Sequence, residues 1–145
     1  MVDVQTEIVV DRPRAVVADY ASTPENAPIW YRNIQSAVWR TPAPLAVGSR
    51  VAFTANFLGR GLSYVYEVEE YVPGEKLVMH TSEGPFPMET TYTWTALGDM
   101  ATRMTLRNKG KPTGFSKIVA PVMATMMRAA NRKDLENIKR ILEKV

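Results

Sequence analysis

The sequence predicts an α+β domain in which one antiparallel sheet packs against a single long C-terminal helix. Residues 2–10 alternate between apolar and polar side chains, as a strand with one buried face does. Further strand-like segments follow one another with short turns between them, at 35–41, 49–57, 62–72, 76–83, 87–97 and 100–109. Such strands are mostly antiparallel, because a parallel crossover needs a dozen or more residues. Residues 114–145 carry apolar side chains at helical spacing and predict the long helix.

Two short helices are expected between the first strand and the rest of the sheet. Asp11 followed by Arg12-Pro13 indicates a helix start, and residues 15–21 form the first short helix. The second begins at 22–25 (STPE), which combines a capping box with a proline in the first turn. Turns are expected at Pro73-Gly74 and Gly98-Asp99. The long helix can then bury its apolar stripe only against the concave face of the sheet.

Composition limits the classes of protein to which the chain can belong. Its 145 residues are read as one domain, 1–145. Cysteine is absent, which excludes disulfides and thiolate metal sites and fits a cytoplasmic location. The net charge is only +3 and acidic residues lie among the basic ones, so we expect no nucleic-acid partner. No secretory signal is visible, and the apolar run at 118–127 is shorter than the roughly 20 residues of a transmembrane helix.

Motifs of the common catalytic sites are nearly absent. His80 is the single histidine, so no multi-histidine metal site can form. No HExxH, phosphate-binding glycine loop or nucleophile-elbow pattern occurs. A site built only from carboxylates stays open, although no EF-hand-like loop is present. We expect neither a metal nor a cofactor.

The strand periodicity indicates an interior that is rich in aromatic side chains. Because alternate residues of a strand face opposite sides, each strand-like segment presents one inward set. These sets include Tyr64, Tyr66, Tyr92, Trp94 and Asn108, which all carry polar groups. A plain core prefers Leu, Ile and Val, whereas a small-molecule pocket combines aromatic side chains with a few convergent polar groups. The alternative is structural, since Tyr and Trp fit any pleated surface.

Several segments resemble one known family. They are 11–13 (DRP) at the end of the first strand, 24–30 (PENAPIW), 48–51, 66–77, 92–94 and 101–105. Together they make the whole chain similar to the START-like polyketide cyclase/dehydrase family of the SRPBCC superfamily. The resemblance implies a helix-grip fold, in which a seven-stranded antiparallel sheet wraps around the long C-terminal helix. It also implies an internal cavity for lipids, sterols, polyketides or other apolar molecules. Some relatives catalyse cyclisation, aromatisation or dehydration, and many only bind or carry a ligand.

On this basis we expect a small hydrophobic or aromatic molecule to bind between the sheet and the long helix. The ligand-binding candidates are Trp30, Phe53, Phe57, Tyr64, Tyr66, His80, Tyr92, Trp94, Asn108, Met123 and Met127. The tyrosines and His80 would orient the polar substituents of the ligand. One alternative is an enzyme of the polyketide cyclase, aromatase or dehydratase type, in which Tyr or His transfers a proton at a carbonyl. Another is a macromolecular interaction module with a filled core. We expect a monomer or a weak homodimer.

Some of these candidates have a competing structural interpretation. His80 shares a strand face with Val78 and Ser82, and that face is either solvent-exposed or turned toward the cavity. Trp30 either anchors the second short helix or lies at the cavity entrance, where the resemblance places it. The loop 57–62 (FLGRGL) is either a mobile flap or a plain glycine hairpin.

The long helix divides into a methionine-rich half and a Leu/Ile-rich half. Met123, Met126 and Met127 are expected to face the sheet, as an ordinary core or as a wall that re-packs around varied ligands. Pro121 projects outward and either kinks the helix or marks its first turn. The second half anchors the helix through Leu135, Ile138, Ile141, Leu142 and Val145.

Polar side chains on the long helix also permit two interpretations. Asn131 and Asp134 fall within its apolar stripe, so they lie beyond the sheet edge or point toward a ligand. Lys117, Arg128, Arg132 and Lys139 share the opposite side, which is a solvated face or a contact for acidic lipid or RNA.

Overall fold

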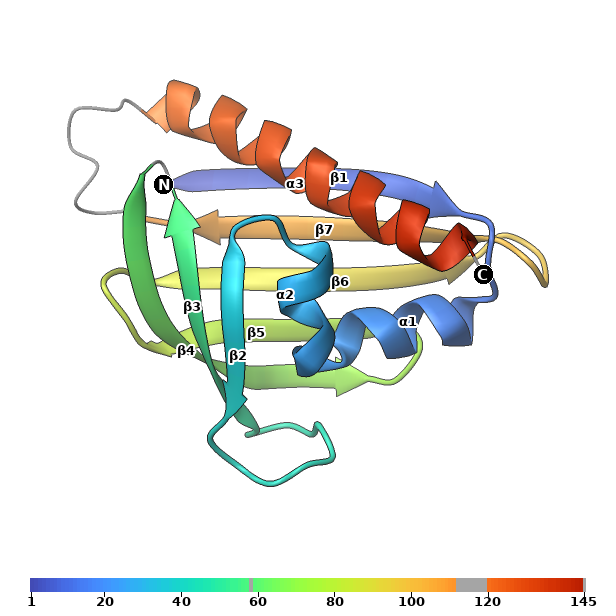
Figure 1. Cartoon of the computed structure of the whole chain (residues 1–145), viewed down its shortest axis with the longest axis horizontal. Coiled ribbons are helices and arrows are strands. Elements are labelled where there is room, and N and C mark those ends of the chain that lie inside the picture. Colours follow the sequence, from blue (N-terminus) through green and yellow to red (C-terminus); the bar gives the residue numbers. More distant parts are fainter. Residues whose placement is uncertain (58, 112–119, 145) are drawn as a thin grey trace.

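The computed structural model describes residues 1–57, 59–111 and 120–144 (Figure 1). Within these residues the strands are β1 (Val2–Val10), β2 (Ile34–Trp39), β3 (Arg50–Phe57), β4 (Arg60–Val72), β5 (Lys76–Glu83), β6 (Met88–Ala96) and β7 (Thr102–Gly110). The helical segments are α1 (Arg14–Ser22), the 3-10 turn η1 (Pro24–Asn26), α2 (Ala27–Trp30) and α3 (Ala120–Glu143). The predicted element order is confirmed, and strand ends differ from the expected ones by at most two residues.

The described strands form one antiparallel sheet in the order β1-β7-β6-β5-β4-β3-β2. Neighbours in this order follow one another along the chain, except that β1 pairs with β7. That pairing is unbroken from Val2 opposite Gly110 to Val10 opposite Thr102. α3 lies against β1 and crosses the sheet diagonally, as Figure 1 shows.

The sheet curves because two of its pairings, β2–β3 and β4–β5, are irregular. The β2–β3 register shifts between Ile34 and Ser36, and the β4–β5 register shifts at Val65/Tyr66 and at Val68/Glu70. A β-bulge adds one residue to one strand of a pair and bends that strand. The β6–β7 pairing has no such shift, and Figure 1 shows β2 and β3 turned away from the direction of β6 and β7. This bend gives the sheet the concave face that α3 covers.

The two short helices form where the sequence predicts them. The predicted capping box, however, does not form. Pro24 stands in the first turn of η1, as expected. The hydroxyl of Ser22 donates instead to the carbonyl of Ala18, 2.6 Å away, and no side chain caps η1. Ser22 is the last residue of α1, so a hydrogen bond back into α1 replaces a cap on the next turn.

Both predicted glycine turns are present. Gly74 has φ of 80°, and the N–H of Glu75 donates to the carbonyl of Val72 at 2.9 Å, which fits the expected type II turn. Gly98 has φ of 82° in the β6–β7 hairpin. In the β3–β4 hairpin Phe57 pairs with Arg60, so the loop there is short; Leu58 lies outside the described residues.

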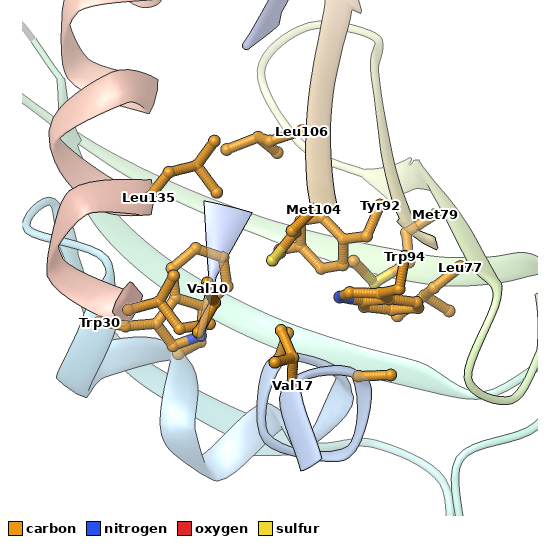
Figure 2. Packing of buried hydrophobic residues seen from close by; sticks show 14 of the residues in the cluster. Val10, Val17, Trp30, Leu77, Met79, Tyr92, Trp94, Met104, Leu106 and Leu135 are labelled. Carbon is orange, nitrogen blue, oxygen red and sulfur yellow. The ribbon is translucent and has the colours of Figure 1, made fainter. Parts of the chain in front are cut away.

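The C-terminal half of α3 anchors the helix, as predicted. Its 24 residues span about 36 Å. Leu135, Ile138 and Leu142 are buried in the main core cluster, while Ile141 is half-buried against it. Figure 2 shows Leu135 pointing from α3 toward Leu106 of the sheet. Val145 lies outside the described residues.

The N-terminal half of α3 differs in part from the expectation. Met123 packs in a second core cluster with Val2 and Val4 at the far end of β1. Met126 is 37% exposed, so the prediction that it faces the sheet is wrong. Pro121 is exposed, as expected. Residues 112–119 are not described, so the choice between a kink at Pro121 and a first helical turn stays open.

Candidate functional site

A cavity of about 150 Å³ lies between the concave face of the sheet, the segment around α2, and α3. Every strand contributes at least one residue to its lining. The lining includes most of the residues proposed from the sequence: Phe53, Phe57, Tyr64, Tyr66, Tyr92, Asn108 and Met127. An apolar cavity of about this size can hold one benzene molecule. The space therefore suits a single ring.

Four sequence candidates lie outside the cavity lining. Trp30 is fully buried in the main core, where its ring contacts Tyr31 with the centroids 4.0 Å apart, so it has the place of an anchor. Trp94 is buried in the same core. Met123 belongs to the second core cluster. Each has a structural role that explains its burial without a ligand.

His80 is the fourth of these residues and lies on the convex face of the sheet. Leu77 and Met79 line the cavity, and the alternation along β5 turns the intervening side chains outward. The side chain of His80 is 39% exposed, and its Nδ1 atom lies 3.6 Å from a carboxylate oxygen of Glu69. The prediction that His80 orients a ligand is therefore not supported by its position.

On the sheet side, three polar side chains of the lining satisfy one another. The hydroxyl of Thr90 donates to Oδ1 of Asn108 at 2.6 Å. The hydroxyls of Tyr66 and Thr90 are 2.7 Å apart. Since Thr90 has a single hydroxyl proton, Tyr66 is the donor of that second bond. Burial raises the pKa of Tyr66 to about 12, so this phenol stays protonated near neutral pH.

A second tyrosine pair lies beside α2. The hydroxyls of Tyr31 and Tyr92 are 2.5 Å apart, and both residues line the cavity. Burial raises the pKa of both phenols well above the usual value, and the nearby charge of Asp134 adds to the rise. Tyr31 was not predicted from the sequence, because it follows α2 in an irregular segment where no periodicity shows which way a side chain points.

On the helix side, α3 contributes Asn131 and Asp134 to the lining. They are only 6% and 3% exposed, respectively, so the interpretation that they lie beyond the sheet edge is wrong. One carboxylate oxygen of Asp134 accepts a hydrogen bond from the backbone N–H of Arg32 at 3.0 Å. Burial raises the pKa of Asp134 to about 6, against the opposing effects of that hydrogen bond and of the Arg32 charge. The amide nitrogen of Asn131 has no hydrogen-bond partner among the described residues.

The remaining surface of α3 carries basic side chains in solvent. Arg128 and Arg132 are exposed. The ammonium of Lys139 donates to the carbonyl of Val9 at 2.9 Å and pairs with Glu143. Lys117 lies outside the described residues.

Among the described residues, no group of three or more His, Cys, Asp or Glu side chains is placed to hold a metal ion. Among the same residues, no helix combines the length and apolar character that crossing a membrane requires.

Comparison with solved structures places the fold. A START superfamily protein from Mycobacterium smegmatis superposes with a TM-score of 0.83 at 13% identity, covering 98% of this chain and 97% of that one. The Zhui aromatase/cyclase from Streptomyces sp. R1128 gives 0.77 at 12% identity, covering 98% and 93%. A major latex-like protein 151 from Panax ginseng gives 0.69 at 13% identity, covering 93% and 96%. These similarities show that the predicted helix-grip fold is correct.

Comparison of the sequence with family models and with curated proteins gives two results. None of the curated proteins compared matches the chain. The family model described as polyketide cyclase / dehydrase and lipid transport matches residues 1–143. The match covers nearly the whole chain, as the resemblance of its segments implied. The chain is a member of the polyketide cyclase / dehydrase and lipid transport family.

Proposed function

We propose that this protein binds a small hydrophobic or aromatic molecule in the cavity between the sheet and α3. The observation that carries the proposal is the lining itself, which combines apolar and aromatic side chains with a few polar groups. That combination is typical of small-molecule sites. Transfer of the ligand's apolar surface from water supplies the binding free energy, at roughly 25 cal/mol per Å² before ordering costs. An interaction module with a filled core is less consistent with such a cavity.

The volume and the lining together suggest the size of the ligand. A cavity of about 150 Å³ accommodates one ring, and a polycyclic ligand requires that the walls move apart. Met79, Met88 and Met127 line the cavity, and the unbranched thioether side chain changes shape at low cost. A monocyclic ligand is therefore our first choice, and larger ones would need repacking of these methionines.

Two neighbouring alanines of α3 provide a direct test. Ala130 lines the cavity, whereas Ala129 is exposed and does not. We expect ethylbenzene, titrated into the ¹⁵N-labelled protein and followed by ¹H–¹⁵N NMR, to bind the native protein and the Ala129→Leu variant with the same dissociation constant. Ala130→Leu fills the cavity and should weaken binding at least tenfold. Equal binding by both variants, or no binding by the native protein, would refute the proposal for a ligand of this size.

A specific observation also favours a catalytic function as the second candidate. Asp134 lines the cavity with a pKa of about 6, so its carboxyl group can both accept and donate a proton near neutral pH. The neutral Tyr31–Tyr92 pair beside it can donate a hydrogen bond to a developing oxyanion. Proton transfer next to a carbonyl group of the ligand is the reaction that this arrangement supports.

Hydrogen exchange of a carbonyl compound tests the second candidate separately. In D₂O the methyl protons of acetophenone exchange through the enol, and ¹H NMR follows their loss. We expect the native protein to accelerate this exchange, and Asp134→Asn, which keeps the shape of the side chain, to abolish the acceleration. If acetophenone binds without any accelerated exchange, the binding function stands and this catalysis is excluded.

A further inference from the structure

Asn131 is a polar residue of the cavity lining whose amide nitrogen is not satisfied within the described part of the protein. Asn131 is only 6% exposed, and it lines the cavity. Its amide nitrogen has no hydrogen-bond partner among the described residues. A buried N–H without a partner costs roughly 1–3 kcal/mol of stability. Buried polar groups are nearly always paired in proteins. A bound ligand that supplies an acceptor would remove this cost.

Two groups of polar side chains in the lining are already hydrogen-bonded within the protein. The Tyr66–Thr90–Asn108 chain uses the hydroxyl protons of Tyr66 and Thr90. The hydroxyls of Tyr31 and Tyr92 share one hydrogen bond, which uses one of their two protons. A ligand whose polar end pairs with Asn131 on α3 places its ring on the sheet side, among the aromatic side chains.

Charge restricts the ligand further. Asp134 is the only ionisable acid or base, apart from tyrosines, among the described residues of the lining, which include no Lys, Arg or His. It lies three positions after Asn131, on the same face of α3. An anionic ligand would lose its hydration without gaining a cation, and it would meet the Asp134 carboxylate. The site thus opposes a carboxylate ligand even though Asn131 offers it a donor.

We propose that the natural ligand is a neutral, ring-sized carbonyl compound whose oxygen accepts a hydrogen bond from the Asn131 amide. This inference rests on the proposed binding function and adds to it the class of the ligand and its orientation. The carbonyl oxygen points to α3, and the hydrocarbon part contacts the concave face of the sheet.

Four probes on nearly one skeleton test the proposal by NMR titration at pH 8. Acetophenone carries the neutral acceptor, ethylbenzene lacks it, benzoate carries a negative charge, and 1-phenylethylammonium a positive one. Asn131→Leu removes the amide, and Asn131→Ala does so with a smaller side chain, in case leucine perturbs the fold. Ala129→Leu, on the exposed side of the same helix, is the control.

We expect either Asn131 variant to shift the ratio of the acetophenone and ethylbenzene dissociation constants roughly tenfold in favour of ethylbenzene. The control should leave the ratio unchanged, and benzoate should bind the native protein at least tenfold more weakly than acetophenone. Acetophenone, but not ethylbenzene, should displace the Asn131 side-chain amide resonances. Without ligand, Asn131→Leu should raise the Tm, since it removes an unpaired polar group; a purely structural role would make the Tm fall.

The outcomes distinguish a failure of the carbonyl assignment from a failure of the proposed binding function. If neither neutral probe binds the native protein, the proposed binding function fails. If both bind but the Asn131 variants leave their ratio unchanged, the binding function stands and the carbonyl assignment is overturned. Tighter binding of benzoate or of the ammonium probe than of acetophenone would overturn it as well.

Discussion

The carboxylate of Asp134 accepts a hydrogen bond from the backbone N–H of Arg32, 3.0 Å away, and so joins the middle of α3 to the segment after α2. One turn later, the amide of Asn137 donates to the carbonyls of Ile29 and Trp30 at 3.2 and 3.0 Å. These bonds fix α2 to α3 beside the cavity. Of Asp134 and Asn137, only Asp134 can change its charge. The attachment of α2 to α3 therefore depends on pH.

The first prediction concerns the pH dependence of stability. Asp134 has a pKa of about 6 in the folded protein and roughly 3.9 in an unfolded chain. Between these values the folded state binds the proton more tightly, so the contribution of Asp134 to stability falls as pH rises from 4 through 6. The loss amounts to about 3 kcal/mol. The Asp134→Asn variant has no such loss. Its free energy of unfolding in urea, relative to that of the native protein, should therefore increase from pH 4.5 to 8. A constant difference across this range would contradict the assignment.

The second prediction concerns the hydroxyl pair of Tyr31 and Tyr92. Replacing either residue by Phe leaves one buried hydroxyl without its partner, at a cost of about 1–2 kcal/mol. Replacing both removes the unpaired group, so the double variant should be more stable than the sum of the single effects implies. Urea unfolding of the four proteins measures the coupling, which we expect to be about 1 kcal/mol. Strictly additive effects would show that the two hydroxyls do not interact.

The third prediction uses two glycines of the sheet. A Cβ atom at Gly110 would lie 2.6 Å from the backbone oxygen of Pro87, so Gly110→Ala must displace backbone and should cost about 1–3 kcal/mol. At Gly61 the nearest atom, Oδ1 of Asn56, is 3.7 Å away, and Gly61→Ala should be neutral or stabilising by up to about 1 kcal/mol. Thermal unfolding compares the two. Similar Tm values for both variants would be inconsistent with the close approach at Gly110.

The fourth prediction concerns His80, which the sequence offered as a ligand-binding candidate. Its side chain lies on the convex face beside Glu69, whereas its neighbour Met79 lines the cavity. His80→Ala should therefore leave the dissociation constant for ethylbenzene unchanged within about twofold, while Met79→Ala, which enlarges the cavity, should change it. If the His80 variant changes the dissociation constant as much as the Met79 variant does, His80 contributes to the binding site.

Strand periodicity predicted the sheet wall of the cavity well. The inward sets of the strands correctly include Tyr64, Tyr66, Tyr92 and Asn108, because a strand alternates strictly between two faces. The same alternation placed Trp94 inward, but β6 carries it past the cavity into the main core. Periodicity gives the face of a strand on which a residue lies, and not its position along a cavity.

Other parts of the site could not be predicted from the sequence. Tyr31 lies in an irregular segment, where no period exists to show its direction. Asn131 and Asp134 fall in the apolar stripe of α3, and polar residues there fit either an exposed helix end or a cavity wall. The structure decides between the two, since both residues are buried and line the cavity. His80 stayed ambiguous because buried residues occur on both faces of β5, including Val78 and Met79.

The most direct test of ligand binding in the cavity is a measurement of contacts between a bound probe and methionine methyl groups. With ¹³C-methyl methionine and ethylbenzene, intermolecular nuclear Overhauser effects should reach Met79, Met88 and Met127, which line the cavity. They should be absent at Met100 and Met126, which are exposed. Overhauser effects confined to the two exposed methionines, or none at the three lining residues under saturating ethylbenzene, would contradict the account.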